Sequence, residues 1–322
     1  SAADDELIHK NAFLAAKQVA SRFATEPGVF ITVQDTGGHF GLEGITRPWM
    51  GGLSGLVKTT AIEWPQASVR AIDIERGDRQ ADAVAAAIDE ELFSGGGGLE
   101  VGLAASGRRI TLQSVQADVE GGTPSVSVDD VIIASGGARG VTAKTLIELA
   151  RTVKVKLALL GRTPLADEPR ACQGISDEPG IKRALLDAAR QSGAKVTPAE
   201  LGRETKKILG AREIRATLDA IRATGSEAEY FAVDIRDASS IGEALSTIRS
   251  TWGAVTGIVH GAGVLADKLI ADKSEEEWQR VFQTKVDGLR ALLEATSEDP
   301  ITMISMFSSV AARGGNRGQC DY

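Results

Sequence analysis

One short stretch constrains the fold of this chain more than any other. Four apolar residues, 131–134, run directly into a turn that contains Gly136, Gly137 and Gly140, and a helical pattern follows as far as Arg151. An apolar run of this kind is typical of a strand buried on both faces of a parallel sheet. Glycines after such a strand let the backbone approach a phosphate, and the next helix offers its N-terminal N–H groups. The stretch therefore predicts a nucleotide-binding turn, with a purely structural turn as the alternative.

The residues after this turn continue the alternation of strands and helices. Further strands are predicted at 156–160, 229–233, 257–259 and 302–307, and helices at 180–191, 198–223, 238–251 and 274–295. Repeated strand–helix units whose first turn is rich in glycine predict a doubly wound sheet, which binds ligands at the carboxyl ends of its strands.

The first part of the chain carries a shorter series of the same kind. Strands are predicted at 28–33, 68–74 and 109–112, and helices at 7–23, 51–65 and 79–92. This order predicts a parallel sheet with helices on its faces, although no glycine turn opens it. Residues 116–127 are rich in Gly, Thr, Pro and Ser and predict a linker.

The length of 322 residues suits about two domains of ordinary size. We therefore expect an α/β protein of two Rossmann-like subdomains, residues 1–125 and 126–322. The second subdomain is expected to contain an inserted helical segment at about residues 165–225.

Charge and composition exclude several classes of protein. The net charge of −8 argues against a broad face that binds nucleic acid by neutralising phosphates. Two cysteines, Cys172 and Cys320, and three scattered histidines give neither a disulfide framework nor the spacing of a metal site. No apolar run approaches the ~18 residues that a membrane span needs. We expect a protein of the reducing cytoplasm that neither spans a membrane nor is secreted.

Three charged residues are predicted near the adenosine end of a bound nucleotide. Arg139 lies inside the glycine turn, and Arg162 follows the second strand, where a carboxylate would suit a free ribose hydroxyl and an arginine suits a 2′-phosphate. Asp234 ends the third strand and is placed to accept from an adenine amine. The sequence thus favours NADPH, with solvated surface charges and a strand-end cap as the alternatives.

The fourth strand ends in a run of small residues, Gly261, Ala262 and Gly263, directly after His260. Small side chains at this edge of the sheet leave room for the ribose and nicotinamide of a cofactor. The lone His260 is expected to be structural rather than to act as a base.

The candidate reactive residues are Lys285, Ser309 and Tyr322. Reduction of a carbonyl needs a proton for the oxyanion that hydride attack creates, and a tyrosine can donate it. An ordinary tyrosine has a pKa of about 10, so a nearby cation such as Lys285 favours the phenolate. A serine can hydrogen-bond and polarise the substrate carbonyl. Ser309 lies 13 residues before Tyr322, and Lys285 lies 24 residues before Ser309.

These motifs together resemble the ketoreductase domains of polyketide synthases and polyunsaturated fatty acid synthases, within the short-chain dehydrogenase/reductase superfamily. The matching stretches are residues 135–142, 160–163, 233–234, 260–264, 285–288 and 307–311 leading to Tyr322. The first part, with its Gly52–Lys58 stretch and Glu63-Trp64-Pro65, resembles the structural subdomain without cofactor that precedes the catalytic one in such domains.

The resemblance implies a function, a cofactor site and partners. Tyr322 would donate the proton, Ser309 would orient the ketone and Lys285 would support the tyrosine, on a β-ketoacyl thioester carried by an acyl carrier protein and next to other synthase domains. The implied NADPH site consists of Ser135, Gly136, Gly137, Arg139, Gly140, Val141, Arg162, Asp234, Ile235, Gly261, Ala262 and Gly263.

The resemblance also predicts the stereochemistry of the product. Domains that form the D-hydroxyl carry Leu-Asp-Asp after the His-x-Ala-Gly-Val motif, and this chain has Leu265-Ala266-Asp267, which keeps the final aspartate. Gly314 stands where the opposite class has a tryptophan. We therefore expect the D-3-hydroxy product.

Several departures from the family pattern leave alternatives open. The glycine turn begins with Ser135 and ends with Thr142, as in the polyunsaturated fatty acid synthases and related unusual synthases. The family continues past the tyrosine with an asparagine, further strands and a lid helix, so we expect the catalytic subdomain to be incomplete at its carboxyl end. The insert at 165–225 is either a contact surface for a neighbouring domain or a solvated decoration. A catalytically silent docking module and a free-standing short-chain dehydrogenase are the alternative functions.

Overall fold

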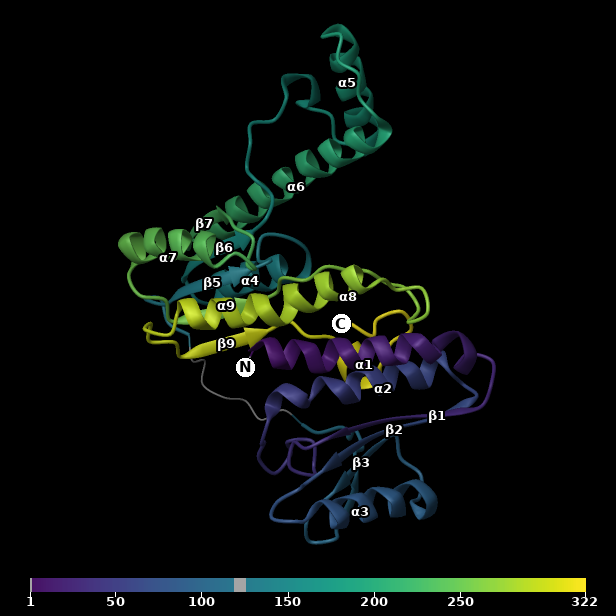
Figure 1. Ribbon diagram of the computed structural model, residues 1–322. Coiled ribbons are helices and arrows are strands. Elements are labelled where there is room, and N and C mark those ends of the chain that lie inside the picture. Colours follow the sequence, from purple (N-terminus) through teal and green to yellow (C-terminus); the bar gives the residue numbers. More distant parts are fainter. Residues whose placement is uncertain (1, 119–125) are drawn as a thin grey trace. The chain divides into compact units, whose positions relative to one another are not determined.

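The structure is a computed structural model that describes residues 2–118 and 126–322 (Figure 1). Its described residues form two compact units. The first unit holds the chain up to residue 118 together with Val264–Phe282 and Ser308–Tyr322, and the second holds residues 126–263 and Gln283–Phe307. The observed division therefore differs from the one expected at residue 125, because two later segments of the chain fold with the first unit. Residues 119–125 of the expected linker lie outside the described residues.

The second unit is built on a parallel sheet of five strands. Its order is β7 (Glu227–Ala232), β6 (Lys156–Gly161), β5 (Val131–Ser135), β8 (Gly257–His260) and β9 (Met303–Met306). The chain builds outward from β5 through β6 to β7, and then returns to β8 on the other side of β5. This is the doubly wound order, so the α/β fold class is confirmed and the crevice of its switch point falls between β5 and β8.

Alternation along the strands divides the core of this unit in two. Ile132 and Ala134 of β5 face α4 (Gly140–Thr152) and α6 (Pro198–Arg222). Val131 and Ile133 face α7 (Ala238–Trp252) and α9 (Gly288–Ala295). Successive strand side chains point to opposite faces, so a continuous apolar run buries both faces of the sheet against helices.

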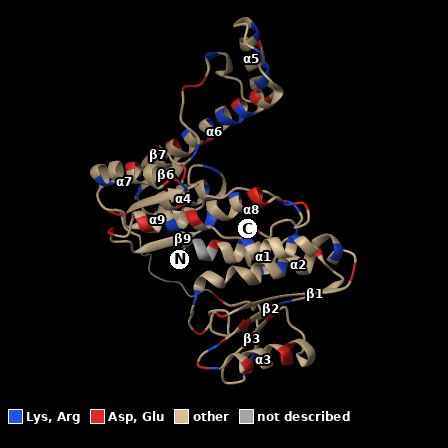
Figure 2. Cartoon of the chain, viewed as in Figure 1, with Lys and Arg blue, Asp and Glu red and all other residues tan. Residues whose placement is uncertain are grey.

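The insert of the second unit consists of η2 (Arg170–Cys172), α5 (Glu178–Gln191) and the first half of α6. Its small core joins Cys172, Ile181 and Ile208. A capping box between Thr197 and Glu200 begins α6. Acidic and basic residues are interspersed along α5 and α6 (Figure 2), with ion pairs between residues three or four apart. Such pairs contribute about 0.3–0.5 kcal/mol each. The charged side chains of α5 are largely exposed, so this helix has a mainly polar outer surface.

The first unit carries a four-stranded sheet. Its strands are β1 (Gly28–Gln34), β2 (Ala67–Ile74), β3 (Glu100–Leu103) and β4 (Arg109–Thr111), with β1 to β3 parallel and β4 antiparallel to β3. The expected parallel strand at 109–112 is thus wrong in direction. The Ala104–Arg108 turn, with Gly107 at φ 84°, folds β4 back onto β3 as a hairpin. The strand β3 was not among the strands predicted from the sequence.

The helices of the first unit include segments from both ends of the chain. Figure 1 shows α1 (Ala2–Phe23) and α2 (Gly52–Glu63) on one side of this sheet and α3 (Ala81–Ser94) on the other. The short helices η1 (Pro48–Met50) and α10 (Val310–Gly314) complete it with α8 (Glu275–Phe282). The Phe13 ring of α1 stacks on Trp278 of α8 at 5.7 Å between centroids, which ties the late segment to the first unit's core.

The helix expected at 274–295 is not a single α-helix. It comprises α8, the π-helical turn η3 (Gln283–Asp287) and α9. None of the helices within residues 2–118 and 126–322 combines the length and the apolar character of a membrane span.

Candidate active site

The glycine turn of the second unit lies directly against the run of small residues after β8. Gly136 has φ 65°, and a Cβ placed on it would lie 2.8 Å from the backbone of Ala262. A Cβ on Gly261 would in turn lie 2.4 Å from Oγ1 of Thr142. Only glycine adopts the positive φ of Gly136 without strain, and at both positions the missing Cβ lets the two loops meet at the switch point.

His260 holds this edge of the sheet together through both ring nitrogens. Nε2 lies 3.0 Å from the carbonyl oxygen of Lys285, which can only accept, so Nε2 carries the hydrogen. Nδ1 then accepts from Oγ of Ser135 at 2.8 Å. Burial, together with the Lys285 charge, lowers the pKa of His260 and keeps the ring neutral. A histidine with both nitrogens engaged in this way is structural.

Lys285 lies in the π-helical turn η3, beside the cofactor-side loops of the second unit. Its Nζ donates to the carbonyl oxygen of Phe307 at 2.9 Å. A Cβ placed on Gly263 would lie 3.0 Å from Cε of Lys285, so the aliphatic part of the lysine runs past this glycine. π-Helical turns are frequent at functional sites, because they shift side chains out of the α-helical register.

Arg162 and Asp234 follow adjacent strands at the carboxyl edge. Asp234 is bound by Arg236, whose Nη2 donates to Oδ2 at 2.6 Å. This hydrogen bond lowers the pKa of Asp234 to about 2, and the Arg162 charge adds to the effect. Arg162 is exposed and, among the described residues, makes no hydrogen bond or ion pair of its own. The edge thus carries one arginine available to a phosphate beside a carboxylate that stays ionised.

Glu213 of α6 is a site residue that the sequence analysis missed. Its carboxylate accepts from Nε of Arg139 at 2.8 Å and from the amide of Gly140 at 3.1 Å. This amide is at the N-terminus of α4, where an anion is stabilised by the helix dipole. A carboxylate therefore accepts from one of the amides that would be expected to bind a phosphate. The spacing of residues along α6 does not indicate this role for Glu213.

The residues of this edge fit a dinucleotide. Gly136 and Gly261 let the glycine turn and the loop after β8 lie against each other, and the amide of Gly140 at the α4 N-terminus already binds an anionic group. Val141 presents an exposed side chain beside that terminus, and Ile235 packs against Gly288, where a Cβ would lie 2.4 Å from its Cδ1. Gly137 packs on Ala134 instead, which is a structural role.

Ser309 and Tyr322 belong to the first unit, whereas Lys285 belongs to the second. Ser309 is the N-cap of α10, and its Oγ accepts from the amide of Ala311 at 3.1 Å. Among the residues that the structure describes, this hydroxyl donates to no partner, so its hydrogen is available to a ligand. Tyr322 is half-buried, and its amide donates to the carbonyl oxygen of Gln319 at 3.3 Å. The ranges 2–118 and 126–322 contain no group of three or more His, Cys, Asp or Glu residues that could hold a metal ion.

The fold and the glycine turn of the second unit define a dinucleotide-binding α/β protein. The family described as KR domain matches residues 131–322, more than half of the chain, and the chain belongs to this family of ketoreductase domains. Membership in this family implies oxidoreductase activity. Domains of this type typically use a nicotinamide cofactor.

Curated relatives agree with this assignment. The chain is 35% identical over 292 residues to a polyunsaturated fatty acid synthase protein of Thraustochytrium sp., in a match that covers 88% of this chain and 10% of that protein. It is 37% identical over 105 residues to polyketide synthase PksL of Bacillus subtilis, in a match that covers 33% of this chain and 2% of that protein. The chain thus spans a tenth or less of the length of these multidomain relatives.

Solved structures show the same fold. A ketoreductase domain from the bacillaene assembly line superposes with a TM-score of 0.70 at 22% identity, over 99% of this chain and 63% of that chain. A-type ketoreductases from a modular polyketide synthase give a TM-score of 0.67 at 22% identity, over 96% of this chain and 56% of that chain.

Proposed function

We propose that this chain is the NADPH-dependent reductase of a β-ketoacyl thioester, carried by the acyl carrier protein of a polyketide or polyunsaturated fatty acid synthase. The observation that carries the proposal is the carboxyl edge of the second sheet, where the glycine turn lies against Ala262 and the Lys285 side chain runs past Gly263. Neighbouring synthase domains are the expected partners, since the relatives that match are synthases of many domains. The reaction would take place in the cytoplasm.

The cofactor side of the site uses residues of the second unit. Ser135, Gly136, Gly137, Arg139, Gly140 and Val141 would hold the pyrophosphate, and Gly261, Ala262 and Gly263 would flank the ribose and nicotinamide. Arg162 would bind the 2′-phosphate, and Asp234 and Ile235 would contact the adenine. When bound, NADPH supplies a hydride to the carbonyl carbon of the substrate.

The remaining chemistry belongs to three side chains of this chain. Ser309 donates a hydrogen bond to the ketone oxygen and polarises it. Tyr322 gives its phenolic proton to the alkoxide that hydride addition creates, and the phenolate takes a proton back from solvent. The Lys285 ammonium stabilises that phenolate. The products are the 3-hydroxyacyl thioester and the oxidised cofactor.

The D-3-hydroxy product is part of the proposal. Asp267, the aspartate kept from the Leu-Asp-Asp motif, accepts from Nε2 of Gln319 at 3.1 Å, three residues before Tyr322. The aspartate is therefore in contact with the segment that would supply the proton donor.

Turnover of a β-ketoacyl thioester surrogate tests the proposal. We expect NADPH oxidation at 340 nm and a D-3-hydroxyacyl product, and a loss of kcat of about 10³-fold in Tyr322→Phe, since general acid catalysis contributes at this level. NADPH binding should be unchanged in this variant, because the cofactor residues are elsewhere. NADPH binding without any turnover would favour a silent docking module.

A further inference from the structure

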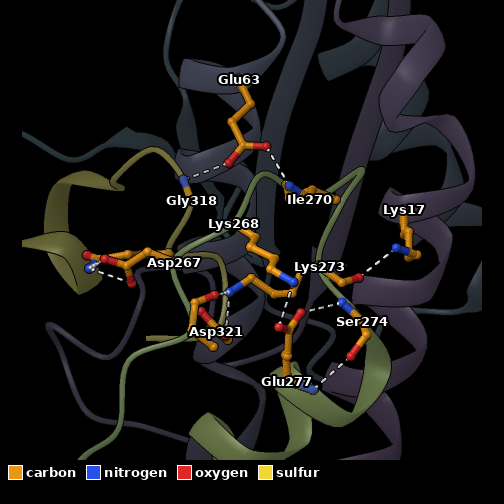
Figure 3. Close-up of polar contacts among 12 residues, drawn as sticks. Lys17, Glu63, Asp267, Lys268, Ile270, Lys273, Ser274, Glu277, Gly318 and Asp321 are labelled. Atoms are coloured by element: carbon orange, nitrogen blue, oxygen red, sulfur yellow. Dashed lines mark hydrogen bonds and ion pairs between the residues drawn. The ribbon is translucent and has the colours of Figure 1, made fainter. Parts of the chain in front are cut away.

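The segment that ends in Tyr322 is held by a buried ion pair. Nζ of Lys273 donates to Oδ2 of Asp321 at 2.6 Å, and the two side chains are 0% and 3% exposed (Figure 3). Asp321 is the residue directly before Tyr322. A buried charge without its partner is costly, so each member of the pair fixes the position of the other.

The same lysine also fixes the loop that precedes α8. Its Nζ donates to the carbonyl oxygen of Ala266 at 2.7 Å, and its own carbonyl oxygen accepts from Nζ of Lys17 on α1 at 2.6 Å. Lys17 binds the carbonyl oxygen of Ala271 as well, at 3.0 Å. The loop that carries Lys273 is therefore anchored on the first helix of the unit.

Glu63, at the end of α2, joins this loop to the final segment from a second side. One carboxylate oxygen accepts from the amide of Ile270 and the other from the amide of Gly318, both at 2.9 Å (Figure 3). The amide of Lys268 donates to the carbonyl oxygen of Gly318 at 3.1 Å. Gly318 has φ 83°, which reverses the chain four residues before Tyr322.

All of these contacts lie within the first unit, whereas the glycine turn and the strand ends beside it belong to the second unit. They converge on residues 318–321, which form a turn stabilised by the bond from the Tyr322 amide to Gln319. Burial raises the pKa of Asp321, and the Lys273 ammonium opposes that rise. Loss of either charge would leave the other one buried without its partner.

We propose that Lys273, Asp321 and Glu63 are positioning residues, which fix the backbone before Tyr322 and thereby orient its phenol toward the substrate carbonyl. The inference rests on the proposed function, in which Tyr322 donates the proton. It assigns a part in the reaction to the first unit, since this unit contributes the anchors although it has no glycine turn. A displacement of about 1 Å in a reacting group costs up to about 10²-fold in rate.

The test compares Asp321→Asn and Lys273→Met with Glu91→Gln. Glu91 is a matched control, because its carboxylate in the same unit is 2% exposed and paired with Arg70 and Arg109. We expect both pair variants to lose at least about 10-fold in kcat, with KM and the NADPH Kd within about threefold. Glu91→Gln should lose stability and keep kcat per folded molecule.

A second readout needs no turnover. The chain has two tyrosines, Tyr230 and Tyr322, so carbon-13 labelling of tyrosine rings gives two signals that Tyr230→Phe assigns. In Asp321→Asn the Tyr322 signal should shift or broaden, while that of Tyr230 stays. The double variant Lys273→Met with Asp321→Asn removes both charges, which recovers folding if the single variants unfold, and should still show the altered Tyr322 signal and low kcat.

Each outcome decides the inference. A folded pair variant that keeps kcat within twofold and an unmoved Tyr322 signal overturns it, and so does a kcat loss that only matches the loss of folded protein. If the unaltered chain shows no turnover, the proposed function fails, and the Tyr322 signal alone then decides whether the pair positions the ring.

Discussion

The two units start from the same strand–helix plan and differ in what binds the loop after the first strand. In the first unit the carboxylate of Asp73, 0% exposed, accepts from the amide and hydroxyl of Thr36 at 2.7 and 2.8 Å and from the amide of Phe40 at 2.7 Å. In the second unit Glu213 accepts from Gly140 at the α4 N-terminus, and its side chain is 46% exposed.

This difference separates a carboxylate that is costly to displace from one that is not. The donors of the first loop are satisfied by a charge that water does not reach, so displacing it would leave a buried carboxylate unpaired. The Glu213 carboxylate can turn into solvent at little cost, because an exposed ion pair contributes about 0–1 kcal/mol. The first unit thus has an anion built into its fold. The anion of the second unit is held weakly enough for an anionic ligand to replace it.

The largest combined loss of stability and NADPH binding is expected from Gly136→Ala, with Gly38→Ala as its counterpart. Both glycines have positive φ, 65° and 79°, and a Cβ on either would come within 3 Å of the neighbouring loop. Each variant should lose about 1–3 kcal/mol of stability from strain. Only Gly136→Ala should weaken NADPH binding, by about 100-fold, as fluorescence titration would measure. Equal loss of binding in both variants would contradict the distinction between the units.

Asp73→Asn and Glu213→Gln compare the two carboxylates directly. We expect Asp73→Asn to lower the free energy of unfolding by about 2–4 kcal/mol, because the charge and one of the two oxygens that accept these three hydrogen bonds are lost. Glu213→Gln should cost less than about 1 kcal/mol and should tighten NADPH binding, since a competing anion is removed. Urea unfolding and titration measure these effects, and weaker NADPH binding in Glu213→Gln would show that the carboxylate assists the cofactor.

Arg162→Ala should change the choice of cofactor. Loss of a charge-assisted bond to the 2′-phosphate is worth about 1.5–3 kcal/mol, or about 10- to 100-fold in the NADPH Kd. NADH binding should stay the same, because NADH lacks this phosphate. Arg76→Ala is the control, since Arg76 is an exposed residue just after β2, the second strand of the first unit. If NADPH and NADH weaken together, Arg162 does not read the phosphate.

The smallest effect concerns pH and the histidine behind the glycine turn. Burial lowers the pKa of His260 in the folded chain below its ordinary value of 6.5. The unfolded chain therefore binds the proton first as pH falls through about 6.5, and stability declines below that pH. We expect the unaltered chain to lose about 1 kcal/mol more than His260→Gln between pH 6.5 and 5.5. Parallel stability curves for the two would contradict the neutral buried ring.

The strands of the second unit could be predicted because their signal is local. An unbroken apolar run such as 131–134 followed by glycine is decided by backbone conformation and by burial of both faces. The same reasoning missed β3 and misdirected β4, because β3 is short and contains Gly102, and the direction of a strand depends on the turn before it. The single helix expected at 274–295 failed for a similar reason, since periodicity does not reveal a π-helical turn at Lys285.

Of the candidate site, the sequence predicted the residues that follow strand ends, and the structure places Ser135, Arg162, Asp234 and Gly261 next to such ends in one parallel sheet. It did not predict Glu213, Lys273 or Asp73, which act through partners distant in the chain. An exposed glutamate on a long polar helix has no local feature that marks it.

By itself the sequence determined the fold class and the glycine turn, and it predicted the candidate cofactor residues and the candidate proton donor. Hydrogen bonding within helices, alternation in strands and the conformational freedom of glycine all act over a few residues, so they can be read from a short stretch. The tertiary structure decided which unit Tyr322 folds with and which charges hold it. Lys273 and Asp321 are 48 residues apart, and only the path of the folded chain brings them together as a buried pair.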